Sequence, residues 1–136
     1  MVKIAVAGIV NDDDKILIGK KRNYKQNDSL GGKWHIPGGK VEQGEHPDAA
    51  IAREILEETR VKISISKVLD IKVFKKEDFI IVIWYECKPI EITKATTNEL
   101  SETKWVAKNQ VLTTVEKEAI EMFPSLVIEY FKGKTL

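Results

Sequence analysis

Apolar and polar side chains alternate along much of the chain, and this period of two predicts β-strands. Residues 2–10 read as a strand, a polar turn occupies residues 11–14, and residues 15–20 form the returning strand of a hairpin. Residues 79–87 are almost continuously β-branched or aromatic, which predicts a buried central strand. Shorter strands are expected at residues 34–36, 63–66, 68–74 and 104–107, with a turn at residues 37–40.

Two stretches have helical spacing instead. A helix is expected from Pro47, whose missing N–H suits the first helical position, to about Thr59. Residues 115–131 repeat apolar side chains at helical intervals, but Pro124 interrupts them and predicts a kink or two pieces. Strands dominate and no internal repeat or linker is visible, so we expect a single α+β domain over residues 1–136.

Composition narrows the classes of function. The 136 residues contain 22 Lys and Arg against 21 Asp and Glu, so no basic field favours binding to a nucleic acid polymer. No apolar run has the length that a membrane span requires. Cys87 is the only cysteine, which excludes an internal disulfide and a cysteine metal cluster. We interpret Cys87 as a small buried hydrophobe and expect a reducing, cytoplasmic location.

Three carboxylates crowd the end of the expected helix. Successive helical residues lie about 100° apart, so Glu57 and Glu58 fall within about 60° of Glu54. Like charges at this spacing repel, and the helix dipole disfavours carboxylates at a C-terminus. A divalent cation reverses both effects, and clustered carboxylates suit Mg²⁺ or Mn²⁺. On the glutamates alone, a solvated face paired with Arg53 and Arg60 is the alternative. The packed face is expected to carry Ala49, Ala52, Ile55 and Leu56.

The residues before the helix favour a site over a solvated face. Gly38 and Gly39 form a corner at which backbone can approach a ligand closely. From Gly39 onward the chain resembles the sequence box of the Nudix hydrolases of the MutT type: G, five residues, E, seven residues, then REUxEExGU, with U aliphatic. Eight of the nine defined positions match, and Arg60 stands where the family has glycine. The matching residues are Gly39, Glu45, Arg53, Glu54, Ile55, Glu57, Glu58 and Val61.

The resemblance implies an α/β/α sandwich with a mixed central sheet, in which the box loop and helix carry the metal site. It also implies the cleavage of a nucleoside diphosphate linked to another group, with Mg²⁺ or Mn²⁺ and a water nucleophile. Arg53 is expected to orient the glutamates, and Glu45 is expected to anchor Arg53. The metal ligands that the resemblance implies are Glu54, Glu57, Glu58 and the carbonyl of Gly38.

The general base is open between a box glutamate, Glu57, and a carboxylate of the late loop that precedes Trp105. Glu99 and Glu102 both lie in that loop, and each is a candidate base or metal ligand. The distance to Trp105 favours Glu99, and ordinary solvated loop glutamates are the alternative.

Substrate binding is expected to need cations for the phosphates. Arg22, which ends the hairpin, suits a bidentate phosphate contact, although a solvated charge run is equally compatible. Lys40 and Gly39 are further candidates, and Trp34 lies either near a base or ribose or in the core. The simplest substrate is a small nucleotide, a nucleoside triphosphate, oxidised or not, cleaved to monophosphate and pyrophosphate. The alternatives are an ADP-sugar or another NDP-linked molecule, or a non-catalytic nucleotide-binding module. A monomer and a homodimer are both compatible with the sequence.

Arg60 is the one box position that departs from the family pattern. If the helix ends through a left-handed residue, a side chain there costs on the order of 1 kcal/mol relative to glycine. Arg60 supplies none of the expected ligands, so we do not expect it to abolish metal binding, but it bears on local stability and on metal affinity.

Overall fold

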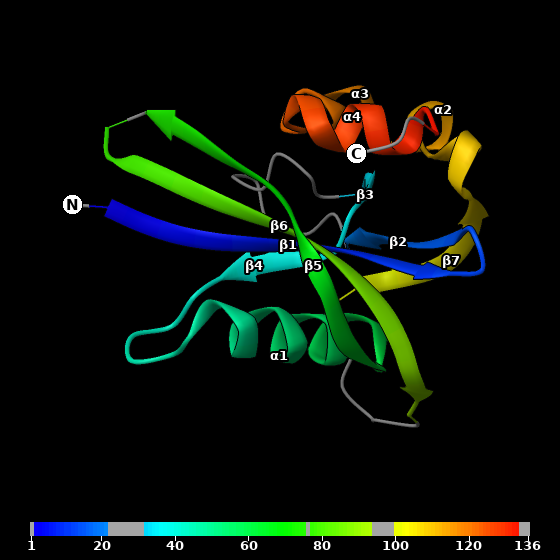
Figure 1. Ribbon diagram of the computed structural model, residues 1–136, viewed down its shortest axis with the longest axis horizontal. Helices are drawn as coiled ribbons and strands as arrows, with labels where there is room; N and C mark the ends of the chain where they lie inside the picture. The colour runs from blue at the N-terminus through cyan, green and yellow to red at the C-terminus, as the bar shows by residue number, and fades with distance from the viewer. Residues whose placement is uncertain (1, 22–31, 76, 94–99, 134–136) are drawn as a thin grey trace.

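The computed structural model describes residues 2–21, 32–75, 77–93 and 100–133, and its centre is a mixed β-sheet with helices on both faces (Figure 1). The strands run in the order β3-β2-β1-β6-β5, while β4 pairs with β1 and β7 pairs with β2. The strands are β1 (Val2–Asp12), β2 (Lys15–Lys21), β3 (Trp34–His35), β4 (Gly38–Lys40), β5 (Val61–Lys75), β6 (Phe79–Ile92) and β7 (Leu100–Ala107). The helices are α1 (Pro47–Thr59), α2 (Val111–Thr114), α3 (Lys117–Ile120) and α4 (Ser125–Phe131), with a short 3₁₀ turn η1 (Lys108–Gln110) before α2.

Strand β1 is the centre of the sheet. It runs parallel to β6, from Val2 opposite Phe79 to Val10 opposite Cys87. It is antiparallel to β4, and only its last two residues pair with β2 across the hairpin. The mixed central sheet that the resemblance implied is therefore confirmed.

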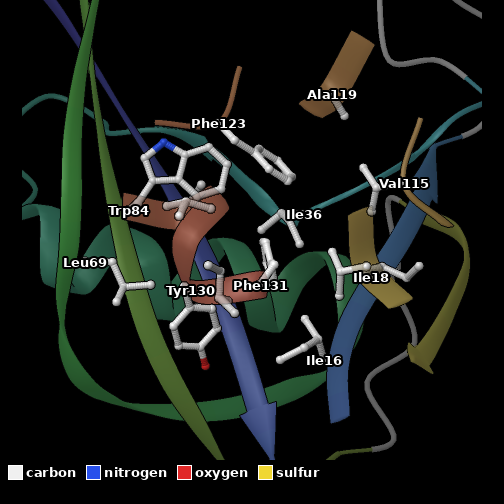
Figure 2. Close-up of a cluster of buried hydrophobic side chains, with 14 of the residues drawn as sticks. Ile16, Ile18, Ile36, Leu69, Trp84, Val115, Ala119, Phe123, Tyr130 and Phe131 are labelled. Atoms are coloured by element: carbon white, nitrogen blue, oxygen red, sulfur yellow. The ribbon is translucent and has the colours of Figure 1, made fainter. Parts of the chain in front are cut away.

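Alternation along β1 divides the interior into two cores. Val6 and Val10 face α1 and pack with its buried side chains. Ala7 and Ile9 face the other way, into the core under α2, α3 and α4, where Trp84 stacks edge-on against Phe123 at 5.1 Å (Figure 2). Because helices cover both faces of one sheet, the expected α/β/α sandwich is confirmed.

Several element boundaries differ from those expected. Residues 38–40 are strand β4 and not a turn, because they pair with Ala5–Ala7 of β1. Residues 61–75 form one strand with three register shifts, where two strands were expected. Strands β6 and β7 are longer than expected, and β7 already begins at Leu100. The helical region after residue 110 is broken at Pro124, as expected, and Pro124 is the residue before α4.

The packed face of α1 is offset from the one expected. Ala49 is exposed, whereas Ala50, Ile51 and Ile55 are fully buried against the sheet. Gly8 of β1 makes this approach possible, because a Cβ there would lie 2.5 Å from Ile55 Cδ1 and 2.9 Å from Ile51 Cδ1. Within the described residues, none of the helices has the length and apolar character needed to cross a membrane.

Candidate active site

Helix α1 is fixed at its N-terminal end by short-range and long-range contacts. The backbone N–H of Asp48 donates to Nδ1 of His46, which caps the helix, and Pro47 occupies its first turn. The hydroxyl of Tyr85 on β6 donates to Asp48 Oδ1 at 2.8 Å. Burial and this carboxylate raise the pKa of Tyr85 above its usual range, so the phenol remains a donor. The helix is thereby held against the sheet, and its C-terminal half carries the candidate site.

Arg53 is the centre of the hydrogen-bond network along this helix. Its Nε and Nη2 donate to the two carboxylate oxygens of Glu45, at 2.7 and 3.0 Å, which is the bidentate geometry of a strong ion pair. Its Nη1 donates to Glu54 at 3.0 Å and to Glu57 at 3.2 Å, and Nη2 also donates to the carbonyl of Lys40 at 3.1 Å. The hydrogen bond from Arg53 lowers the pKa of Glu45, and the bond to Glu45 raises the pKa of Arg53. The expectation that Glu45 anchors Arg53 beside the glutamates thus agrees with the geometry.

The three box glutamates differ in environment. The side chain of Glu54 is 12% exposed and that of Glu57 is 45% exposed, whereas Glu58 is buried and accepts a hydrogen bond from the N–H of Gly38 at 3.2 Å. Burial raises the pKa of Glu54, and the nearby Arg53 opposes that rise. Two carboxylates are therefore held in a desolvated position, which a merely solvated acidic face does not do.

The two glycines of β4 hold the strand close to the site. A Cβ at Gly39 would overlap the carboxylate of Glu54, with both oxygens within 2.6 Å. A Cβ at Gly38 would overlap the backbone carbonyl of Val6 and lie 2.9 Å from Cα of Ala7. The backbone was expected to approach a ligand closely at both glycines. In the structure Gly38 instead approaches β1, and Gly39 approaches Glu54 of α1.

The donor set suits a hard divalent cation, because three carboxylates of one helix end lie beside a backbone strand. As they lie, Glu54 and Glu57 bind Arg53, and Glu58 binds the Gly38 N–H. Within residues 2–21, 32–75, 77–93 and 100–133, no three carboxylate, imidazole or thiol groups converge as a complete cation site. The chemistry of the ligands fits Mg²⁺ or Mn²⁺, and the ligand roles of the glutamates and of the Gly38 carbonyl stay predictions.

Arg60 ends α1 in the left-handed conformation, with φ of 67° and ψ of 14°. Its N–H donates to the carbonyl of Leu56 at 2.9 Å, and its own carbonyl accepts from the N–H and the hydroxyl of Thr93. Its buried Nε has no hydrogen-bond partner among the described residues. The conformation that favours glycine is thus present, and the arginine occupies it at a cost.

Those predicted substrate-binding residues that the structure describes lie on two strands, β3 and β4. Trp34 of β3 is half-buried and packs against the core under α2, α3 and α4, with Nζ of Lys104 4.2 Å from its ring centroid and Nζ of Lys20 at 5.8 Å. Lys40 is exposed on β4 and meets the site through its carbonyl. Arg22 and Glu99 lie outside the described residues.

Glu102 belongs to strand β7 and not to a loop. It is exposed and lies opposite Lys20 of β2. Side chains alternate along β7, and Val106 packs into the core under α2, α3 and α4, so Glu102 shares that face. Trp105 packs on the α1 side. Glu102 therefore projects from the face opposite α1.

Two supports of Arg53 were not foreseen from the sequence. One is the carbonyl of Lys40, and the other is Glu42, whose Oε1 lies 3.6 Å from Nη1 of Arg53. A backbone carbonyl has no side-chain signature, whereas Glu42, three residues before Glu45 in the same loop, was visible as a second carboxylate.

Comparisons with known proteins agree with this architecture. The model of the NUDIX domain matches residues 1–126. The chain is 28% identical over 109 residues to a MutT-like protein of Streptomyces ambofaciens, covering 79% of this chain and 66% of that one. Over 56 residues it is 45% identical to an ADP-ribose pyrophosphatase of Methanocaldococcus jannaschii, covering 41% and 31% of the two chains. The aligned part thus spans less than two thirds of either relative.

A solved structure of similar fold is a NUDIX hydrolase from Nitrosomonas europaea. It superposes with a TM-score of 0.76 at 18% identity, covering 98% of this chain and 90% of that one. At this identity the likeness shows the fold.

Proposed function

The chain belongs to the Nudix family, and from this premise we propose that it hydrolyses a phosphoric anhydride bond in a nucleoside diphosphate linked to another group. We propose Mg²⁺ or Mn²⁺ as the cofactor. The observation that carries the proposal is the Arg53 network, which holds Glu54 and Glu57 on one helix end beside the buried Glu58. A single arginine that fixes two helix glutamates and one loop glutamate is expected where the positions of these carboxylates matter for catalysis.

The roles of the residues follow from their environments. Glu54, Glu57 and Glu58 would hold the cation, together with the carbonyl of Gly38. When bound, such a cation neutralises the diphosphate, lowers the pKa of water and stabilises charge that develops at phosphorus. Arg53 orients Glu54 and Glu57 through hydrogen bonds from Nη1, and its own position depends on Glu45. Substitution of Arg53 or of Glu45 is expected to displace the metal-binding carboxylates without removing any of them.

The general base is proposed to be Glu57 or Glu99. Glu57 is the most exposed of the three box glutamates, so its carboxylate is accessible to water. Glu102 is disfavoured because it projects from the opposite face of the sheet. A comparison of Glu57→Gln and Glu99→Gln separates the two candidates: the base variant loses the acidic limb of the pH–rate profile, and the other keeps it.

The substrate is proposed to be a nucleoside triphosphate, cleaved to monophosphate and pyrophosphate. The likeness to a MutT-like protein supports this choice, whereas the higher local identity to an ADP-ribose pyrophosphatase supports an ADP-sugar as the second candidate. Trp34 is a weaker candidate for stacking a base, because Lys104 lies over its ring. Arg22 and Lys40 remain the proposed phosphate contacts.

A substrate panel tests the proposal directly. Nucleoside triphosphates, their oxidised forms and ADP-sugars are incubated with Mg²⁺ or Mn²⁺, and the released monophosphate and pyrophosphate are quantified. Glu57→Gln is expected to lower turnover by at least about 100-fold. Glu91→Gln, which removes an exposed glutamate of β6 paired with Lys62 of β5, is the matched control and is expected to keep full turnover. Nucleotide binding without any product would instead identify a non-catalytic module.

A further inference from the structure

Helix α1 is too short to cover the face of the sheet on which it packs. Its 13 residues extend about 20 Å. Strands β5 and β6, with 15 and 14 residues, extend about 45–50 Å each. Figure 1 shows the ends of β1, β5 and β6 near the β5–β6 connection reaching well past α1. Part of this face therefore has no helix over it.

The uncovered part of the face is apolar. Val6 and Tyr85 mark the face that packs against α1. In register with them, β1 continues through Ile4 and Val2, which lie opposite Ile81 and Phe79 of β6. Strand β5 adds side chains opposite Tyr85, Ile83 and Ile81 of β6. The exposed members, which we call the apolar strip, are Val2, Ile4, Val68, Ile71, Val73 and Phe79.

The apolar strip is large for a surface in contact with water. Its six residues are 38–56% exposed. Side chains of this size present about 170–200 Å² on average when free, so six that are half exposed leave roughly 500–600 Å² uncovered. That area is at the upper end of the largest patches on monomers, about 300–600 Å². The opposite face of the same strand ends is covered instead, because Phe74 and Ile80 pack against the core under α2, α3 and α4.

We propose that the apolar strip is covered by the apolar strip of a second copy of this chain, in a two-fold symmetric dimer. Two facing strips bury roughly 1,000–1,200 Å², which reaches the size of about 1,000 Å² at which specific interfaces begin. A uniformly apolar patch suits a two-fold interface, because each copy presents the same residues to the other. Additional contacts at the rim add to this area.

The proposed interface borders the candidate active site. A groove of about 700 Å³ lies beside the strip, between Val2 and Ile4 on one side and the loop of residues 40–45 on the other. That loop provides the Lys40 carbonyl and the Glu45 carboxylate that hold Arg53. A second copy seated on the strip therefore closes one side of the loop that supports Arg53.

Sedimentation velocity on the whole chain tests the dimer by its mass, independently of activity. We expect the wild type to be dimeric at about 100 µM and to dissociate on dilution. The double variant Ile71→Glu, Val73→Glu is expected to dissociate at least 100-fold more readily. The matched control is Ile90→Glu, which replaces a residue of β6 that is 67% exposed and lies outside the strip, and it is expected to remain dimeric.

Circular dichroism of all three proteins establishes that they are folded, since every substituted side chain is already more than half exposed. A wild type that is monomeric at about 100 µM overturns the proposal, including the case in which the strip binds a different protein or a lipid surface. A double variant that dimerises as tightly as the wild type overturns it as well.

Discussion

Alanine substitutions at Gly38 and Gly39 are predicted to have opposite consequences, although the two residues are adjacent on β4. A Cβ at Gly38 overlaps the backbone of Val6 and Ala7, which belongs to the central strand and has no room to move. Overpacking of this kind costs about 1–3 kcal/mol. We therefore expect Gly38→Ala to lose about 2–3 kcal/mol of unfolding free energy, or roughly 10 °C in Tm for a domain of this size.

At Gly39 the obstructing atoms are the carboxylate of Glu54, the free end of a flexible side chain. Glu54 can rotate away and lose its contact with Arg53, at a cost of up to about 1 kcal/mol. The added methyl group restricts the unfolded chain, which raises the unfolding free energy by about 0.4–1 kcal/mol. Gly39 also has no positive φ that would strain an alanine. The net change in unfolding free energy is therefore expected to be within about 1 kcal/mol.

Metal affinity is predicted to fall in Gly39→Ala although its stability is largely kept. Displacing Glu54 removes a proposed ligand from its place, and disturbances of this kind weaken metal binding by about 10–100-fold. Urea unfolding gives the stability of both variants, and isothermal titration with Mn²⁺ gives the affinity. If Gly39→Ala is as unstable as Gly38→Ala, or binds Mn²⁺ as tightly as the wild type, then the close approach of β4 to Glu54 does not organise the site.

Three further predictions concern single residues. Arg53→Lys replaces a guanidinium that donates to Glu45 from two nitrogens by a single ammonium group. We expect a loss of about 1–2 kcal/mol in the unfolding free energy measured in urea, and at least a tenfold loss in turnover. Unchanged values would show that the contacts to Glu45 are dispensable. Arg60→Gly is expected to raise the unfolding free energy by about 1 kcal/mol, because the position has φ of 67°, and a loss of stability in the same measurement would mean that packing of the arginine outweighs its strain. Burial raises the pKa of Cys87 to about 12, which keeps the thiol protonated, so a disulfide reagent at about pH 8 should label it only after unfolding, and rapid labelling of the folded protein would contradict its burial.

Local periodicity was enough to predict most of the fold. The hairpin of β1 and β2, the core of β6 and the whole of α1 follow from spacing and from Pro47, which are properties of neighbouring residues. Strand β4 was missed because Pro37 followed by two glycines is typical of a turn. Its pairing with β1, and the need for glycine beside Val6, depend on residues about 30 positions away. The parallel pairing of β1 with β6 is non-local in the same way.

The side chains of the candidate site were predictable from the sequence, whereas its backbone contacts were not. The box positions indicated the Arg53–Glu45 pair and the glutamates, and the structure brings these groups together. The contact of Arg53 with the Lys40 carbonyl had no sequence signal, since every residue has a carbonyl. The exposed apolar strip was equally hidden, because the pattern predicted strands but could not show that α1 ends before the strands do.

Burial favours the proposed metal site over a solvated acidic face at the end of α1. Glu57 alone, 45% exposed, is compatible with a solvated face, but Glu58 is 2% exposed and the Glu54 side chain 12% exposed. Removing carboxylates from water is costly unless opposite charge compensates them. One guanidinium faces four carboxylates here, those of Glu42, Glu45, Glu54 and Glu57, so Arg53 balances only part of the charge. The remaining negative charge sits where the helix dipole is also unfavourable, and a bound divalent cation removes both penalties at once. The same surplus of charge that lowers the stability of the unliganded helix end is therefore the driving force that we propose for binding metal.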